Sequence, residues 1–376
     1  AFAATDLFFL YAFHELALIP TFLMIGLFGR GENRVRTAWT ITIYLGVGSL
    51  ILLVGLIMAV TTLGGSTFAI GELLEIARDP ATNLGAAKQT WIFAFLLVGF
   101  GILVSLFPFH SWAAPAYAEA PAPVAMLHAG VLKKFGLYGL IRIAMPLMPA
   151  GAEALTEVVL VLLLGNILYL GLVTIAQTRL DRMLGCSSVM HMGYIFLGIA
   201  SANSLGLSGA VLLMFAHGVS IALLFALCGW MRDRFGTIEF EKLGGVANQL
   251  PKLGIVFGFA IFAAAGLPGF ANFAAEVPVF FGAFQSGGTE LGWFQWTTML
   301  ALWGVVISAV YLLRAYRRIF MGPTAEKMAT PGDLTWATRL PVMILLASLI
   351  AVGFVPELLN RFIRPAIDGL FLAVGG

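Results

Sequence analysis

The stretch 120–142 reads APAPVAMLHAGVLKKFGLYGLIR, and it is apolar over a length that can cross a membrane. It nevertheless carries two adjacent lysines, Lys133 and Lys134, near its middle. A lysine at the centre of a bilayer costs about 3 kcal/mol on insertion scales, so it persists only where it faces a partner, a wet cavity or a transport path. The other segments of the chain are therefore expected to form a helical bundle around these buried charges.

Composition places the whole chain in a membrane. Hydrophobic residues make up 60% of the 376 residues, charged residues only 11%, and the mean hydropathy is +0.97. A soluble domain carries about 25% charged residues. Runs of about 20 apolar residues recur along the chain, which predicts an all-α polytopic membrane protein. The two cysteines form no metal motif, and a net charge of +2 gives no indication of nucleic acid as a partner.

Ten spanning segments can be drawn from the apolar runs. Their approximate ranges are 6–29, 37–63, 90–112, 124–147, 152–178, 182–200, 204–230, 254–286, 296–320 and 339–361. Two of them are expected to be broken: the third runs into the proline-rich stretch 107–123, and the eighth carries GLPGFANF (266–273) in its centre. Broken helices at membrane depth free backbone groups and are typical of transporter sites, although a simple kink is the alternative.

Basic residues gather in alternate loops. The loops 30–36, 179–182, 231–253 and 314–339 hold fourteen lysines and arginines, against four in the loops of the opposite side. The positive-inside rule therefore predicts that these basic loops are cytoplasmic, that the first span enters from outside and that the C-terminus ends outside. The stretch FAIGELLEIA (68–77) is expected to form a short interfacial helix on the outer side.

Four ionisable residues fall well inside apolar segments, namely Glu15, Lys133, Lys134 and Glu276. Glu15 can be read instead as half of a structural ion pair, and Glu276 as a carboxylate that satisfies backbone amides freed by the break. The two lysines lie about 100° apart around a helix, so they are expected to face different partners. Buried acids and bases that alternate at the midplane can exchange protons, so this pattern predicts a proton relay.

Five histidines add groups that titrate near physiological pH, at positions 14, 110, 128, 191 and 217. His191 and His217 lie in successive spans at similar depth, which favours a hydrated path between them. A structural hydrogen-bonding role is the alternative for each. They are not spaced as metal or haem ligands on one helix.

Several stretches carry a family resemblance, namely FPFHSW, EAPAPVAMLHAGVLKKFGLYGLIR, SSVMHMGYIFLGIA, GAVLLMFAHGVSIALLFALCG and GLPGFANFAAE. They resemble the antiporter-like subunits of proton-pumping NADH:quinone oxidoreductase, respiratory complex I, and chain M (mitochondrial subunit 4) in particular. Family members have fourteen helices built from two inverted repeats. The resemblance implies one transmembrane domain over 1–376 that supplies helices five to fourteen and lacks the first four. Its half-repeats would span 1–147 and 152–320, with a final helix at 339–376.

The resemblance also implies a proton path. Glu15 matches the family's helix-five glutamate, Lys134 the central lysine of helix eight, and Glu276 the acid beside the second break. The candidate relay residues, in chain order, are Glu15, His110, Lys133, Lys134, His191, His217 and Glu276. No cofactor or metal site is expected in this chain, because the family's NADH, FMN, iron–sulfur and quinone sites lie in other subunits. The implied partners are neighbouring antiporter-like and small membrane subunits and the lipid bilayer, in a bacterial cytoplasmic membrane.

This chain departs from the family pattern in two places. The family has a lysine seven residues before the histidine of FPFHSW, paired with the helix-five glutamate, whereas this chain has Leu103. The family also has a Pro-Asp-Ala-His-like run after the tryptophan, where this chain has Ala-Pro-Ala-Tyr at 114–117. Glu15 has therefore lost its usual partner. One hypothesis is that the additional Lys133 compensates for Leu103.

Three functions remain open from the sequence. The first is a proton-translocating membrane subunit of NADH:quinone oxidoreductase. The second is a subunit of a multi-subunit cation/proton antiporter or of a related membrane hydrogenase. The third is a non-pumping scaffold paralogue, which Leu103 favours but Lys134 and Glu276 oppose, because a scaffold has no use for charges that are costly to insert.

Overall fold

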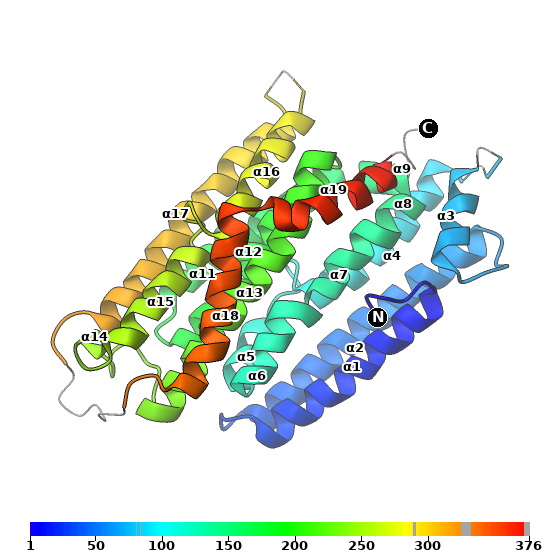
Figure 1. Ribbon diagram of the computed structural model, residues 1–376. Helices are drawn as coiled ribbons and strands as arrows, with labels where there is room; N and C mark the ends of the chain where they lie inside the picture. Colours follow the sequence, from blue (N-terminus) through cyan, green and yellow to red (C-terminus); the bar gives the residue numbers. More distant parts are fainter. Residues whose placement is uncertain (80, 83, 289–290, 325–331, 372–376) are drawn as a thin grey trace.

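The computed structural model describes residues 1–79, 81–82, 84–288, 291–324 and 332–371. Long helices run side by side, with α1 (Leu7–Phe28) and α2 (Arg34–Thr62) at one edge and α17 (Trp293–Phe320) at the other (Figure 1). Nine helical stretches of this described part are long and apolar enough to cross a membrane. The predicted all-α polytopic membrane fold is confirmed. Lys327, one of the fourteen basic residues of the predicted cytoplasmic loops, lies outside the described residues.

The first four helices follow the predicted segments closely. The backbone N–H of Phe8 donates to the Asp6 side chain at 2.8 Å and caps the start of α1, because the first amides of a helix have no partner within it. The short helix expected at 68–77 is α3 (Ile70–Arg78). The third span begins as α4 (Ala86–Val104) and resumes, after an irregular stretch, as α5 (Ala113–Glu119).

The break after α4 is held by one asparagine. Ser105 takes a left-handed conformation (φ 64°), which ends the helix. The Asn166 amide lies against this break: its Oδ1 accepts from the Phe107 N–H at 2.7 Å, and its Nδ2 donates to the Ser105 carbonyl at 3.1 Å. The same Nδ2 donates to the Val189 carbonyl at 3.0 Å. Backbone groups released by the break are thus satisfied inside the protein, as membrane depth requires.

The fourth and fifth spans are helical throughout but contain wide π turns. The fourth consists of α6 (Ala122–Leu127), η1 (His128–Leu132), α7 (Lys134–Gly139), η2 (Leu140–Ala144) and α8 (Met145–Leu147). The short α9 (Pro149–Ala154) leads to the fifth, made of α10 (Thr156–Leu164), η3 (Gly165–Tyr169) and α11 (Leu170–Ala176). Single π turns inside α-helices occur frequently at functional sites. One of them, η1, ends immediately before the lysine pair.

The centre of the bundle is α12 (Leu180–Ala200), which is buried along almost its whole length, whereas most of α1 is not. It packs against α5, α10, α11 and the long α13 (Ser204–Phe235). Small residues allow the closest approaches, as is usual between membrane helices. Gly209 of α13, for example, lies directly against the backbone of the eighth span.

The eighth span is broken as predicted. After the short α14 (Val246–Gln249) it runs as α15 (Pro251–Ala264), and it resumes as α16 (Ala271–Ser286). Between them Gly266 and Gly269 have φ of 71° and 96°, conformations that glycine adopts without strain. Neither half is among the nine stretches of the described residues that are long enough to cross a membrane alone.

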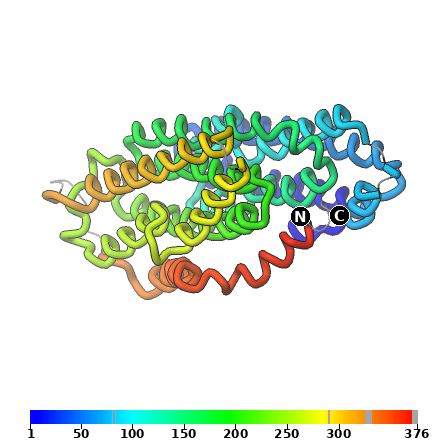
Figure 2. Tube along the Cα trace, turned by 90° about the horizontal axis from the view of Figure 1, so that it is seen from above, coloured from blue at the N-terminus to red at the C-terminus, as the bar shows by residue number. Residues whose placement is uncertain are grey.

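The last predicted segment is wrong in its second half. It was expected as a span at 339–361 within one final helix at 339–376, but α18 (Trp336–Phe354) ends at Phe354 and a separate α19 begins at Glu357 (Glu357–Phe371). Pro356 explains the end, because a proline disfavours helical geometry in the residue before it, here Val355. Figures 1 and 2 show α18 and α19 on one face of the bundle, with α19 running across the other helices.

Candidate functional site

Lys134 lies at the centre of the described polar groups. It is the first residue of α7, separated from the π turn η1 by Lys133 alone, and only 4% of it is exposed. Its ammonium donates to the Ala129 carbonyl and contacts Nδ1 of His217, on α13, at 2.9 Å. A buried lysine with a neutral histidine acceptor has a hydrogen-bonded route along which a proton can leave.

His217 and His191 continue this route toward the second broken helix. Their ring centroids lie 5.4 Å apart. Nδ1 of His191 lies 2.8 Å from the Ser187 carbonyl, and its Nε2 lies 3.2 Å from the carbonyl of Ala264, the last residue of α15. A neutral imidazole can donate to only one of these carbonyls, and a protonated one to both. His191 can therefore hold a passing proton with both N–H groups satisfied.

Glu276 lies just beyond the break, near the middle of α16, and is only 5% exposed. Its carboxylate packs across the break against Gly266, where any side chain would collide with it. The ring of Tyr194, on α12, lies 5.5 Å from that of Phe280, which is four residues after Glu276 on α16. The Tyr311 hydroxyl is 2.7 Å from the Ser187 hydroxyl. Glu276 therefore contacts the break at Gly266, and His191 of α12 contacts it at Ala264.

The Lys133 side chain points to a different cluster of residues from that of Lys134, as was predicted from the angle of about 100° between the two lysines around the helix. Only 1% of it is exposed, and its ammonium, which has no hydrogen-bond partner among the described residues, lies 5.8 Å from the centre of the Tyr117 ring. The Tyr117 hydroxyl lies 3.4 Å from Nδ1 of His128. An ammonium over an aromatic face is a favourable arrangement in a dry interior. This cluster lies on the same span as Lys134 but uses other neighbours.

Glu15 is at the edge of the bundle rather than in its core. Its side chain is 36% exposed, Oε1 lies 3.5 Å from Nδ1 of His14, and Oε1 also accepts from the Ser49 hydroxyl. Leu103, in place of the family's lysine, is buried apolar core. Within the described part of the chain the ion pair of Glu15 is with His14. Lys133 therefore does not replace the missing lysine as a direct partner.

His14 connects this edge pair to the core. Its ring stacks on Phe135 with centroids 4.6 Å apart, and Phe135 follows Lys134 in the chain. His110, by contrast, lies at the first break, where it stacks on Phe107 at 5.5 Å. His110 is therefore outside the contacts that join Lys134 to Glu276.

Sequence reasoning missed several polar residues of this region. Tyr194 lies against His191 and Phe280, Asn272 lies in the first turn of α16 after the second break, and the Tyr117 ring lies beside the Lys133 ammonium. None of the three was singled out as functional. Asn272 stands inside the quoted GLPGFANF motif, which was the available signal. Within the described residues, no group of three or more His, Cys, Asp or Glu is placed to hold a metal ion.

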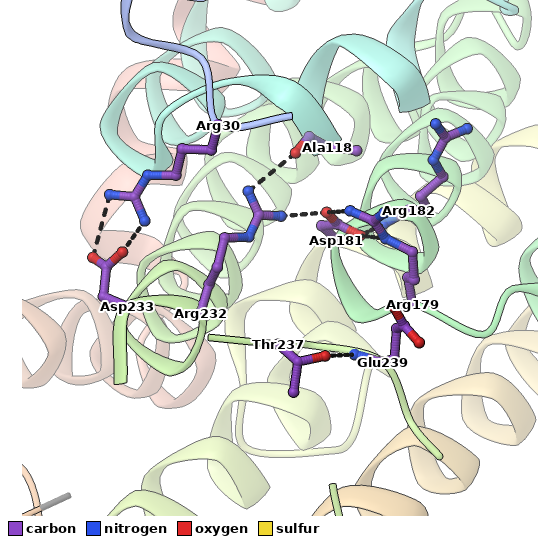
Figure 3. A network of polar contacts seen from close by, with 9 residues as sticks. All are labelled: Arg30, Ala118, Arg179, Asp181, Arg182, Arg232, Asp233, Thr237 and Glu239. Atoms are coloured by element: carbon purple, nitrogen blue, oxygen red, sulfur yellow. Dashed lines mark hydrogen bonds and ion pairs between the residues drawn. The ribbon is translucent and has the colours of Figure 1, made fainter. Parts of the chain in front are cut away.

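A second polar cluster stabilises the face that carries the basic loops (Figure 3). Asp181, in the first turn of α12, accepts from Arg179 at 2.9 Å and from Arg232 of α13. Arg232 also donates to the Ala118 carbonyl of α5 at 3.1 Å. The hydrogen bond with Asp181 raises the pKa of Arg179 above its ordinary value. Asp181 and Arg232 together thus join α5, α12 and α13.

The fold and these contacts define a polytopic membrane protein with a buried line of protonatable groups. Residues 4–308 match the family described as NADH:quinone oxidoreductase/Mrp antiporter, TM. The chain belongs to this family, and the resemblance to chain M is confirmed.

Two curated relatives illustrate the match. The chain is 37% identical over 363 residues to NAD(P)H-quinone oxidoreductase chain 4 2 of Thermosynechococcus vestitus, covering 96% of this chain and 67% of the relative. It is 32% identical over 375 residues to NADH-quinone oxidoreductase subunit M of Rhodobacter capsulatus, covering 98% and 72%.

Solved structures share the fold. A chain of respiratory complex I from Thermus thermophilus superposes with a TM-score of 0.90 at 30% identity, covering all of this chain and 76% of that one. A chain of the Mrp complex from a Dietzia species gives a TM-score of 0.86 at 21% identity, covering 98% and 74%, which is a likeness of fold alone.

Proposed function

We propose that this chain is a proton-translocating membrane subunit of an NADH:quinone oxidoreductase. The observation that carries the proposal is the buried series of contacts from Lys134 through His217 and His191 to the second break, with Glu276 beyond it. Lys134, a charge that costs about 3 kcal/mol to insert, is retained here in hydrogen-bonding contact with the titratable His217. A path for protons accounts for this charge, and a scaffold does not.

In this proposal the chain does no redox chemistry itself. Donor oxidation and quinone reduction take place in other subunits that carry NADH, FMN, iron–sulfur clusters and quinone. Neighbouring antiporter-like and small membrane subunits transmit the resulting charge shifts to this chain. The membrane is a bacterial cytoplasmic membrane with the basic loops, including the Asp181 cluster, on the cytoplasmic side. Glu15 and His14, at the exposed edge of the bundle, are placed to respond to a neighbour.

A cation/proton antiporter subunit is the second candidate, because the matched family includes Mrp antiporters. The two functions differ in their driving force. An antiporter subunit exchanges Na⁺ or K⁺ for protons under an imposed pH gradient, without an electron donor. The proposed subunit moves protons only while electrons flow to the quinone.

Glu276→Gln is expected to lower redox-driven proton uptake at least about tenfold, because glutamine fills the same space but carries no proton. The measurement is proton uptake by membrane vesicles that contain the assembled complex, related to the rate of electron transfer. Glu75→Gln is the matched control, since Glu75 is an exposed carboxylate on α3. Uptake by Glu276→Gln equal to that of the control would remove Glu276 from the path.

Lys133→Leu is expected to lower proton uptake roughly tenfold, because it removes the ammonium beside Tyr117 and His128 while leaving the Lys134–His217 contact intact. If Lys133 compensates for Leu103, the double variant Leu103→Lys, Lys133→Leu regains uptake. A Lys133→Leu variant that pumps as well as the parent would show that Lys133 has no part in the path.

A further inference from the structure

A polar cavity of about 400 Å³ lies beside the Asp181 cluster, on the face that carries the basic loops. Its walls come from the loop after α1, the end of α5, the start of α12 and the segment that follows α13. Ligand pockets in proteins are typically about 300–1,000 Å³, so this cavity has room for a small polar molecule or for a lipid head group. Its lining contains none of the candidate relay residues, all of which the structure describes.

Positive charge in the cavity wall comes from four arginines, namely Arg30, Arg179, Arg182 and Arg232. Three of them pair with aspartates of the same face, as Figure 3 shows. Among the described residues, Arg182 binds Asp181 through its backbone N–H only. The guanidinium group of Arg182 is therefore the one that is left to the cavity.

Glu119, the last residue of α5, brings a buried carboxylate to the same cavity. Only 5% of it is exposed, and its Oε2 is buried without a hydrogen-bond partner among the described residues. The carboxylate lies directly against Gly31, where an added Cβ would collide with it. The Arg30 N–H donates to the Glu119 carbonyl at 2.9 Å and fixes the same loop. A buried carboxylate oxygen without a partner is costly, so a hydrogen-bond donor is expected in the cavity beside it.

The two unpaired groups require a ligand with two different ends. A simple anion would pair with Arg182 but would be repelled by the Glu119 carboxylate, and a simple cation would meet the reverse. A guanidinium group pairs well with a phosphate, and an ammonium donates charge-assisted hydrogen bonds to a carboxylate. A short zwitterion that carries both groups satisfies the cavity.

We propose that this cavity binds an ammonium–phosphate zwitterion, whose ammonium donates to Glu119 and whose phosphate accepts from Arg182. Two sources have this chemistry, namely the head group of an ethanolamine phospholipid and free phosphoethanolamine. The position of the cavity favours the lipid. Leu27 and Phe28, directly before the loop that lines it, are 63% and 69% exposed, so acyl chains have an apolar surface beside the head group. Basic pockets between membrane helices on the cytoplasmic side bind lipid phosphates.

The test measures the thermal unfolding of the assembled complex in nanodiscs of two lipid mixtures. One contains phosphatidylethanolamine with phosphatidylglycerol, and the other has phosphatidylcholine in place of the ethanolamine lipid. Choline carries the same charge as ethanolamine but has no N–H to donate to Glu119. A ligand that binds only the folded chain raises its unfolding temperature, so we expect the parent to be about 3 °C more stable with the ethanolamine lipid.

Glu119→Gln and Arg182→Gln are each expected to remove most of this difference between the two mixtures. The matched controls are Glu241→Gln and Arg318→Gln, because both residues are exposed on the same face and neither lines the cavity. Both controls should keep the parental difference. If Glu119→Gln does not assemble, Arg182→Gln decides, since its guanidinium group has no protein partner to lose among the described residues.

Free phosphoethanolamine, added to the choline mixture, separates the two sources. Stabilisation of the parent but not of Arg182→Gln would identify the free zwitterion as the ligand, and no stabilisation would leave the lipid. A parental difference that persists in Glu119→Gln and Arg182→Gln would overturn the inference. Equal unfolding temperatures of the parent in the two mixtures, without any effect of free phosphoethanolamine, would do the same and would indicate a purely structural role for Glu119.

Discussion

Lys134→Ala is expected to reduce redox-driven proton uptake about a hundredfold, with the amount of assembled complex unchanged. The ammonium is the only group of its span in hydrogen-bonding contact with His217 among the described residues, and it joins the fourth span to the histidine pair. Alanine suits a helix and carries no charge to bury, so the substitution does not burden folding. The measurement is proton uptake per electron transferred in membrane vesicles.

Lys134→Arg is the matched control for this result. Arginine keeps the positive charge but does not release its proton in a protein, so it should also stop proton uptake. A purely structural role of the charge predicts the opposite, namely that arginine restores uptake and alanine does not. Normal uptake by the arginine variant would therefore contradict a relay through Lys134.

Asp181→Ala is expected to have the largest effect on stability. The Asp181 side chain is only 2% exposed, and it pairs with Arg179 and with Arg232, whose side chain is 18% exposed. Removing one member of a buried ion pair typically costs about 3–5 kcal/mol, because the remaining charge stays buried without compensation. Here that charge is Arg232, since the Arg179 side chain is 42% exposed and keeps its contact with water. We expect a clear fall in the thermal unfolding temperature of the purified complex and in the amount of chain assembled in the membrane.

Asp233→Ala provides the comparison, because Asp233 pairs with Arg30 on the same face but its side chain is 54% exposed. An exposed ion pair contributes about 1 kcal/mol or less. The unfolding temperature of this variant should stay close to that of the parent. If both variants lose the same stability, the Asp181 cluster is not the contact that joins α5, α12 and α13.

Much of this fold could be predicted from the sequence, because apolar runs indicate which segments cross the membrane and basic loops indicate which side is cytoplasmic. Both breaks were also predicted, since proline and glycine leave few conformations at membrane depth. The end of the last span was missed although Pro356 was visible, because the apolar residues Leu358 and Leu359 of α19 were counted into the span. Charged residues recur along α19 among the apolar ones, so it is an amphipathic helix and not the end of a span.

The site was predicted in part. The offset between Lys133 and Lys134 follows from helical geometry alone, and the structure gives them the separate neighbours His217 and Tyr117. The pairing of Glu15 could not be predicted, because its partner, His14, is adjacent in sequence and adjacent residues point to different sides of a helix.

The most direct test of a single path is proton uptake by Lys134→Ala, Glu276→Gln and the double variant in the same vesicles, each related to electron transfer. When two groups act in series, removing either one stops proton transfer along the whole path. The predicted result is that the double variant is no worse than the more impaired single variant. Losses that multiply in the double variant, or uptake near the parental level in either single variant with the complex assembled, would contradict one proton path through Lys134 and Glu276.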